Sequence, residues 1–260
     1  MSATWPNEPA DAILITDFPM SGLVGSGWNV SFNSSCFVAS DATAPLSPSS
    51  IIEHRYPVGF VAGEAPCIHF YTYAGKKKLY IGFWIKISNP WQSHPSGNKM
   101  VYIGKDNLSP LQTIFIGMLA GKLWIQLVMP GINNSHLDNS DGDVVGPRNI
   151  HPNVNNPTVT LGVWHRIEAL LQHSTNTTSQ DGIVRWWIDG IQGRESTNVN
   201  FSTSSWVQTE VASVWGGVGG TKSELDTFLY DHIHLSSFTS TATDPPAGTA
   251  GLPEPTIMIA

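Results

Sequence analysis

The sequence predicts an all-β protein, folded as a two-sheet antiparallel sandwich of the jelly-roll type. Polar and apolar residues alternate with a period of two in one short segment after another. Gly, Pro, Asn and Asp separate these segments and supply the turns. No segment shows the sustained apolar spacing of a helix. About a dozen short strands joined by polar loops are typical of such sandwiches.

The clearest strand covers residues 79–88, where every odd-numbered residue from Leu79 to Ile87 is apolar. Trp84 and Lys86 then occupy the opposite face, because successive side chains point to opposite sides of a sheet. Asp189-Gly190 predicts a hairpin turn, since both central residues of a type I′ turn need a positive φ, and Ala120-Gly121 predicts another. The other expected strands are residues 12–15, 36–39, 50–55, 67–73, 100–104, 113–119, 123–129, 163–173, 184–188, 191–195 and 227–236.

We expect one jelly-roll domain at residues 17–237, an N-terminal arm at residues 1–16 and a flexible Thr- and Pro-rich tail at residues 238–260. The long loop 130–156 has no predicted strand, and loops of this length are usually functional or mobile. The last residues, 256–260, are apolar again. Such an end can add a strand to a neighbouring subunit and so allow self-association, but a disordered terminus is the favoured interpretation.

Composition narrows the functional classes. The formal net charge of −7 argues against nucleic acid as a partner, because phosphate binding needs a basic surface. No apolar run approaches the roughly 20 residues of a spanning helix, so we expect no membrane insertion. Residues 1–18 lack the basic and apolar regions of a secretory signal. Asn-x-Ser/Thr triplets nevertheless suggest an extracellular or virion-surface location; they begin at Asn29, Asn33, Asn107, Asn133, Asn176 and Asn200.

Six segments carry a family resemblance: residues 55–59 (RYPVG), 80–86 with Asn89-Pro90-Trp91 and His94-Pro95, 164–168 (WHRIE), 181–190 (DGIVRWWIDG), 215–217 (WGG) and 230–233 (YDHI). Their order resembles the concanavalin A-like lectin/glucanase jelly rolls. Within that group the chain is most similar to polysaccharide lyases related to glucuronan and alginate lyases, and to laminin-G-like modules. The resemblance covers about residues 17–237. It is specific for the fold, which hosts lectins, lyases, hydrolases and structural modules.

The resemblance implies a sheet that binds glycan through aromatic rings and polar side chains. We expect these residues to line one solvent-open trough, although aromatic residues of a second face can also pack under loops. The candidates are Tyr73, Trp84, Lys86, Trp124, Gln126, Arg185 and Trp187.

The sequence bears on two enzymatic chemistries, glycoside hydrolysis and β-elimination. The Glu-x-Asp-x-x-Glu motif of hydrolases with this fold is missing, and Glu168 is expected to pair with a neighbouring Arg166 or Arg194. β-Elimination on a uronate needs a base, an acid and a group that neutralises the carboxylate, and His69, Tyr71 and Arg55 would meet those needs if they converge. The chain departs from the alginate-lyase signatures Arg-x-Glu-x-Arg and Gln-Ile/Val-His, because residues 53–55 read EHR and residues 67–69 read CIH.

Folds of this group often hold a structural Ca²⁺ between the first and last strands, so the resemblance implies Asp17 and Asp231 as ligands. No other cofactor is expected. His232 and His234 should face away from Asp231 unless a bulge intervenes. The acidic run 138–143 fails the EF-hand template and is interpreted as a solvated loop. Cys36 and Cys67 permit one disulfide, or two free buried thiols.

We therefore expect a lyase-like jelly roll that binds a polysaccharide, with acidic polymers among the candidates. The alternatives are a structural module, such as a virion-decoration, fibre or extracellular-filament subunit, and an active uronate-polysaccharide lyase. Sequence alone leaves all three open.

Overall fold

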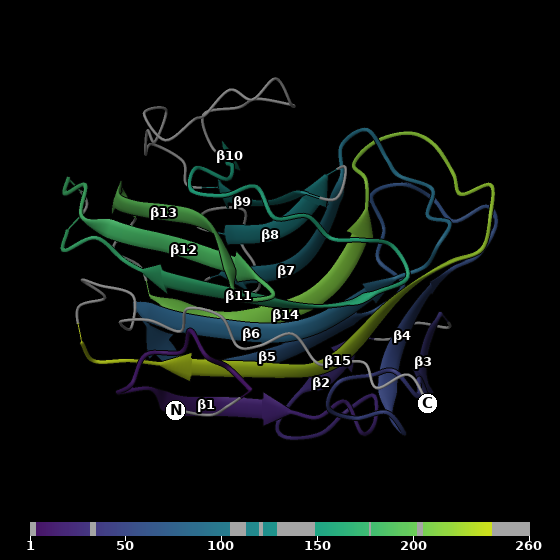
Figure 1. Ribbon diagram of the computed structural model, residues 1–260, viewed down its shortest axis with the longest axis horizontal. Helices are drawn as coiled ribbons and strands as arrows, with labels where there is room; N and C mark the ends of the chain where they lie inside the picture. Colours follow the sequence, from purple (N-terminus) through teal and green to yellow (C-terminus); the bar gives the residue numbers. More distant parts are fainter. Residues whose placement is uncertain are drawn as a thin grey trace, which may run out of the picture.

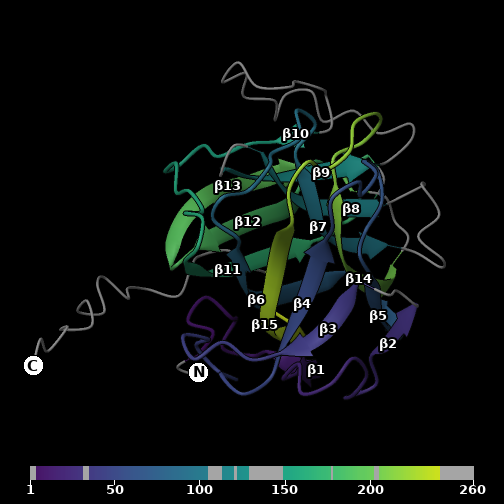
Figure 2. The ribbon, with the colours of Figure 1, turned by 90° about the vertical axis from the view of Figure 1, so that its right-hand side faces the viewer.

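The computed structural model describes residues 4–31, 35–104, 113–119, 122–128, 149–176, 178–201 and 205–240; residues 113–119, 122–128 and 149 are described by their backbone alone. Two antiparallel sheets lie face to face and confirm the jelly-roll sandwich (Figures 1 and 2). No helix in this part of the chain is long and apolar enough to cross a membrane.

The eight-stranded sheet has the order β13-β12-β11-β6-β15-β4-β3, with β1 also paired to β15. Its strands are β1 (Ile13–Phe18), β3 (Cys36–Ala39), β4 (Ile51–Tyr56), β6 (Lys78–Ile87), β11 (Trp164–Gln172), β12 (Gly182–Ile188), β13 (Ile191–Val199) and β15 (Asp226–Ser237).

The seven-stranded sheet has the order β10-β9-β8-β7-β14-β5-β2. Its strands are β2 (Asn29–Ser31), β5 (Ile68–Lys76), β7 (Asn98–Gly104), β8 (Thr113–Leu119), β9 (Lys122–Val128), β10 (Asn149–Ile150) and β14 (Trp206–Trp215).

The period of two decides which side chains enter the core between the sheets. On β6 the odd-numbered residues from Leu79 to Ile87 are fully buried in that core, as the sequence predicts. On β14 and β7 of the facing sheet, Val211, Val101 and Ile103 do the same. The even-numbered residues of β6 instead point to the outer face of the eight-stranded sheet.

The Asp189-Gly190 hairpin is confirmed. The two residues have φ angles of 53° and 82° and join β12 to β13, which pair in register from Ile188 and Ile191. Ala120 and Gly121 lie outside the described residues, but Leu119 and Lys122 on either side are paired.

The N-terminal segment packs onto the domain, which corrects the expected arm at residues 1–16. Trp5 is 2 % exposed and joins Tyr80 and Trp187 in an apolar cluster on the outer face of the eight-stranded sheet. β1 begins at Ile13, four residues before the expected start of the domain at residue 17, because it pairs with the end of β15.

The end of the described chain packs beside that N-terminal segment. Phe238, the first residue of the expected tail, is buried in the Trp5 cluster. Asp11 Oδ2 accepts hydrogen bonds from the backbone N–H groups of Thr239, at 3.0 Å, and Ser240, at 2.6 Å. Residues 241–260, which include the apolar end expected to self-associate, lie outside the described residues.

A bulge in β15 changes the expected direction of its histidines. Asp231 is opposite Trp84 and Ile233 opposite Phe83, so His232 is an extra residue with a φ of 66°. The alternation therefore restarts after the bulge. His234, opposite Gly82, faces the same side of the sheet as Asp231, which corrects the sequence expectation.

Candidate functional site

The outer face of the seven-stranded sheet carries a group of polar and aromatic side chains in its middle strands. On β14, Gln208 and Glu210 alternate with the buried Thr209 and Val211 and are themselves partly exposed. We call this surface the Glu210 face. Its described members are Phe70, Thr72, Lys99, Tyr102, Gln208 and Glu210.

Cross-strand register aligns the centre of this face. Glu210 is directly opposite Phe70 on β5 and Tyr102 on β7, so a carboxyl group lies between two aromatic residues. Side chains in such pairs are neighbours, with Cβ atoms about 5 Å apart. The backbone register continues from Tyr102 to Phe115 on β8, Gln126 on β9 and Asn149 on β10.

Partial burial changes the proton affinities on this face. Burial raises the pKa of Glu210, although the hydrogen bond that Gln208 Nε2 donates to Glu210 Oε1, at 2.6 Å, opposes the shift. Burial also raises the pKa of Tyr102, and the charge of Glu210 adds to the effect. Burial lowers the pKa of Lys99. The face therefore offers a carboxyl, a phenol and an ammonium whose charged forms are only partly solvated.

Trp84 and Lys86 lie on the opposite side of the molecule, on the outer face of the eight-stranded sheet. Lys86 Nζ is 2.7 Å from Asp41 Oδ2, and the guanidinium of Arg166 lies 5.7 Å from the centre of the Trp84 ring. Both residues are partly exposed and are already engaged by neighbouring protein groups.

Arg185 and Trp187 share this outer face but are covered. They are 2 % and 4 % exposed. Arg185 is paired with Glu195 at 2.6 Å, and Trp187 belongs to the cluster that Trp5 and Phe238 close. Neither is available to a glycan in this conformation.

His69, Tyr71 and Tyr73 point into the sandwich, so the expected trough does not form around them. Their strand β5 aligns His69 with Val211 and Tyr71 with Thr209, which are fully buried core residues. The Tyr73 hydroxyl lies 3.0 Å from Thr209 Oγ1.

The structure does not bring together the three residues expected to catalyse β-elimination. Arg55 is on the outer face of the other sheet, with Glu53 Oε1 2.7 Å from its Nε and the ring of Phe37 under its guanidinium. His69 is fully buried, and the hydroxyl of Tyr71 lies 3.4 Å from the carbonyl of Ile15. No polymer can meet these groups at one point of the surface.

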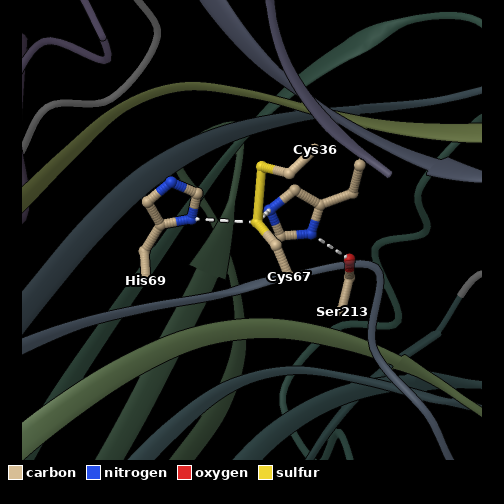
Figure 3. The surroundings of a disulfide bond; sticks show 5 residues. Cys36, Cys67, His69 and Ser213 are labelled. Atoms are coloured by element: carbon tan, nitrogen blue, oxygen red, sulfur yellow. Dashed lines mark hydrogen bonds between the residues drawn. A yellow bond between two sulfur atoms is a disulfide. The ribbon is translucent and has the colours of Figure 1, made fainter. Parts of the chain in front are cut away.

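The surroundings of His69 are unusual for a sandwich core. Cys36 and Cys67 form a disulfide, which resolves the alternative that the sequence left open, and His69 Nδ1 lies 3.4 Å from Cys67 Sγ (Figure 3). A second buried histidine, His54, places its Nε2 3.2 Å from the same sulfur. Burial lowers the pKa of His69 to about 4 and that of His54 well below its usual range, so both rings are neutral near pH 7.

Trp124 and Gln126 are on β9 of the seven-stranded sheet, at positions opposite Gly117 and Phe115. Their side chains lie outside the described part of the structure. Their role in glycan binding stays a prediction.

Asp17 and Asp231, the residues expected to bind Ca²⁺, both contact other protein groups, and a calcium site at these residues stays a prediction. Asp17 Oδ1 lies 2.8 Å from His232 Nε2 and 3.4 Å from His234 Nδ1. Ca²⁺ prefers oxygen ligands to imidazole nitrogens. Asp231 Oδ2 accepts the backbone N–H groups of Leu46 and Ser47, at 2.7 and 3.1 Å. Ca²⁺ takes about six to eight oxygen ligands, so an ion bound by these two carboxylates would need further oxygen ligands.

Sequence reasoning missed the Glu210 face for two reasons. Residues 206–215 were not predicted as a strand, although Thr209, Val211 and Ser213 alternate with Gln208 and Glu210. On β5 both faces carry aromatic residues, so the alternation alone does not show whether Phe70 or Tyr71 faces solvent. The expected ion pair of Glu168 with Arg166, by contrast, is confirmed at 2.9 Å.

No protein-family model matches the chain, and no curated protein matches it in sequence. Solved structures do match. The alginate lyase of family PL-14 from Aplysia kurodai has a TM-score of 0.65 at 10 % identity, over 87 % of this chain and 100 % of that one. The alginate lyase vAL-1 from Chlorella virus has a TM-score of 0.59 at 14 % identity, over 87 % of this chain and 100 % of that one.

An endo-β-1,4-glucuronan lyase from the fungus Trichoderma reesei has a TM-score of 0.58 at 16 % identity, over 81 % of this chain and 91 % of that one. The chain therefore has the jelly-roll fold that these polysaccharide lyases also have. At these identities the likeness establishes the fold, and the functional residues must be argued from this chain's own geometry.

Proposed function

We propose that the protein binds a polysaccharide across the outer face of its seven-stranded sheet. The observation that carries this proposal is the row Phe70–Glu210–Tyr102, in which two aromatic residues flank a carboxyl on a partly exposed sheet face. Rings of this kind offer flat apolar surface to a sugar, while the carboxyl and the phenol hydrogen-bond to its hydroxyls. The polysaccharide lyases that share the fold support a polysaccharide as the partner.

An acidic polymer fits this face better than a neutral one. Lys99 contributes a cation on the same side of the sheet, and a uronate carboxylate would offset its charge. Burial raises the pKa of Glu210, so its carboxylate is protonated more readily beside a uronate and repels it less.

Affinity electrophoresis in gels that contain alginate, glucuronan or a neutral β-glucan tests the proposal. We expect Tyr102→Ala and Phe70→Ala to weaken binding of an acidic polymer by at least about tenfold each, because central aromatic residues dominate binding energies. Trp84→Ala, on the opposite outer face, is the matched control and should leave binding unchanged. Binding that is lost with Trp84→Ala and kept with Tyr102→Ala would move the site to the other sheet.

A second candidate function is β-elimination on a uronate polymer at the same face. The Glu210 carboxylate would take the proton alpha to the uronate carboxyl, Lys99 would neutralise that carboxyl group, and the phenol of Tyr102 would protonate the leaving oxygen. Absorbance of the unsaturated uronate product measures this activity directly. Loss of product with Tyr102→Phe, while binding in the gel is kept, would support catalysis; wild-type protein that binds the polymer and releases no product would contradict it.

A further inference from the structure

Four potential metal ligands meet in the core through two elementary features of β-structure. Cys36 on β3 is directly opposite His54 on β4, so their side chains lie side by side on the inner face of the eight-stranded sheet. Cys67 immediately precedes β5 and is two residues before His69, so these side chains also share a face. The two pairs come from opposite sheets and meet between them.

The distances suit a single ion. One ligand atom from each of the four residues lies within 4.8 Å of all the others, and no other group of three or more histidines, cysteines or carboxylates does so in the part of the chain that the structure describes. Cys67 Sγ is 3.2 Å from His54 Nε2 and 3.4 Å from His69 Nδ1. Tetrahedral Zn²⁺, with Zn–S near 2.3 Å and Zn–N near 2.1 Å, separates sulfur and nitrogen ligands by about 3.5 Å.

A hydrogen bond already orients one of the rings. His54 Nδ1 lies 2.6 Å from Ser213 Oγ on β14, and Ser213 is fully buried. When Nδ1 donates to that hydroxyl, the lone pair of Nε2 faces the sulfurs. Zinc-bound histidines are oriented in this way by a partner on their other nitrogen.

Charge also favours this donor set. The four residues are at most 6 % exposed, so an ion with unbalanced charge would be strongly disfavoured. Two thiolates balance the charge of Zn²⁺, and two imidazoles complete the coordination without adding charge. A set of two sulfurs and two nitrogens in tetrahedral geometry selects zinc over calcium or magnesium.

We propose that Cys36, His54, Cys67 and His69 form a structural zinc site when the disulfide is reduced. A dithiol reductant transfers two electrons and two protons to the Cys36–Cys67 disulfide, which becomes two thiols, and the reductant itself becomes a disulfide. Zn²⁺ then displaces the two thiol protons, which pass to solvent. In the reverse direction a small-molecule disulfide accepts two electrons from the two thiolates and two protons from solvent, so it becomes two thiols while Cys36–Cys67 re-forms and Zn²⁺ is released. Disulfide and zinc are therefore alternative cross-links between Cys36 and Cys67.

Cobalt substitution tests the site on the full-length protein. Protein reduced with a phosphine and incubated with Co²⁺ should bind one ion per chain and show the visible bands of tetrahedral cobalt, with thiolate charge-transfer bands in the near ultraviolet. Zn²⁺ should displace the cobalt and abolish the bands. Oxidised protein should take up neither ion. Reduced wild-type protein that keeps its circular dichroism spectrum and binds no Co²⁺ or Zn²⁺ would overturn the proposal.

Variants separate this site from adventitious binding. Ser213→Ala keeps all four ligands and should weaken zinc binding about 10- to 100-fold in a chelator competition. His54→Cys should keep one bound cobalt and raise the charge-transfer absorbance about 1.5-fold, because three thiolates replace two. His232→Asn removes a histidine on β15 outside the cluster and should change nothing. Cobalt bands that persist in a Cys36→Ser/Cys67→Ser variant would contradict the assignment.

Discussion

His234 Nε2 lies 2.7 Å from Glu8 Oε1, although the two residues are 226 positions apart in the chain. His234 Nδ1 is also 3.4 Å from Asp17 Oδ1, and the ring of Trp5 stacks on the imidazole at 5.5 Å between centroids. One histidine on β15 therefore connects the N-terminal segment and β1 to the outer face of the eight-stranded sheet.

The first prediction is a loss of stability in mild alkali. Burial alone would lower the pKa of His234, but hydrogen bonds with Asp17 and Glu8 outweigh it and raise the pKa to about 9. A histidine with a raised pKa stabilises the fold fully below its unfolded pKa of about 6.5, and the effect is lost as pH rises through 9. The loss should be on the order of 3 kcal/mol. Urea unfolding at pH 6.5 and 9.5 measures it, and His234→Gln should flatten the dependence.

The second prediction concerns Glu210. Its raised pKa means that the folded state disfavours the carboxylate, so stability should rise as pH falls through the raised pKa. Glu210→Gln should therefore be more stable than the wild type at pH 7 and lose this pH dependence, while polysaccharide binding weakens. Denaturant midpoints and gel affinity report the two effects separately. A variant that is less stable at pH 7 would contradict the electrostatic argument.

The third prediction concerns the buried ion pair of Lys222 and Asp226. Lys222 Nζ is 2.5 Å from Asp226 Oδ2 and 3.6 Å from the centre of the Trp91 ring, and both charged side chains are fully buried. Lys222→Met leaves the carboxylate without its cation and should cost about 3–5 kcal/mol. The double variant Lys222→Met/Asp226→Leu should recover much of the loss. Equal destabilisation in both variants would show that packing, not charge, dominates.

The fourth prediction concerns the packing of the Trp5 side chain against Gly82. A Cβ atom added at Gly82 would lie 2.4 Å from Trp5 Cε3, so Gly82→Ala must displace the indole. We expect a loss of about 1–3 kcal/mol and faster proteolysis of the N-terminal segment. Gly217→Ala is the matched control, because its added Cβ meets only Ser96 atoms at 3.7 Å. Cleavage at the wild-type rate in Gly82→Ala would contradict this packing.

The alternation of apolar and polar residues predicts the core well, because a strand that is buried on one face only shows a strong period of two in its sequence. The faces of β6 and the turn at Asp189-Gly190 follow directly from residue types. The bulge at His232 could not be predicted from residue types, because no local sequence signal marks the extra residue that reverses the alternation. Sequence analysis therefore placed His234 on the wrong face.

The candidate site was harder to predict than the fold. β5 carries His69, Tyr71 and Tyr73 on one face and Phe70 on the other, and composition alone favours the face with more polar rings. The structure turns that face inward, where His69 meets the two cysteines instead of a glycan. Which face is buried depends on the partner sheet, which local sequence does not specify.

Asp11, near the start of the described chain, contacts the last two described residues, Thr239 and Ser240. A short peptide could bridge these neighbouring points, and the chain could be reopened at the Asp189-Gly190 turn. Such a circularly permuted protein should keep the sandwich, since the covalent order of its strands would change while their pairing would not.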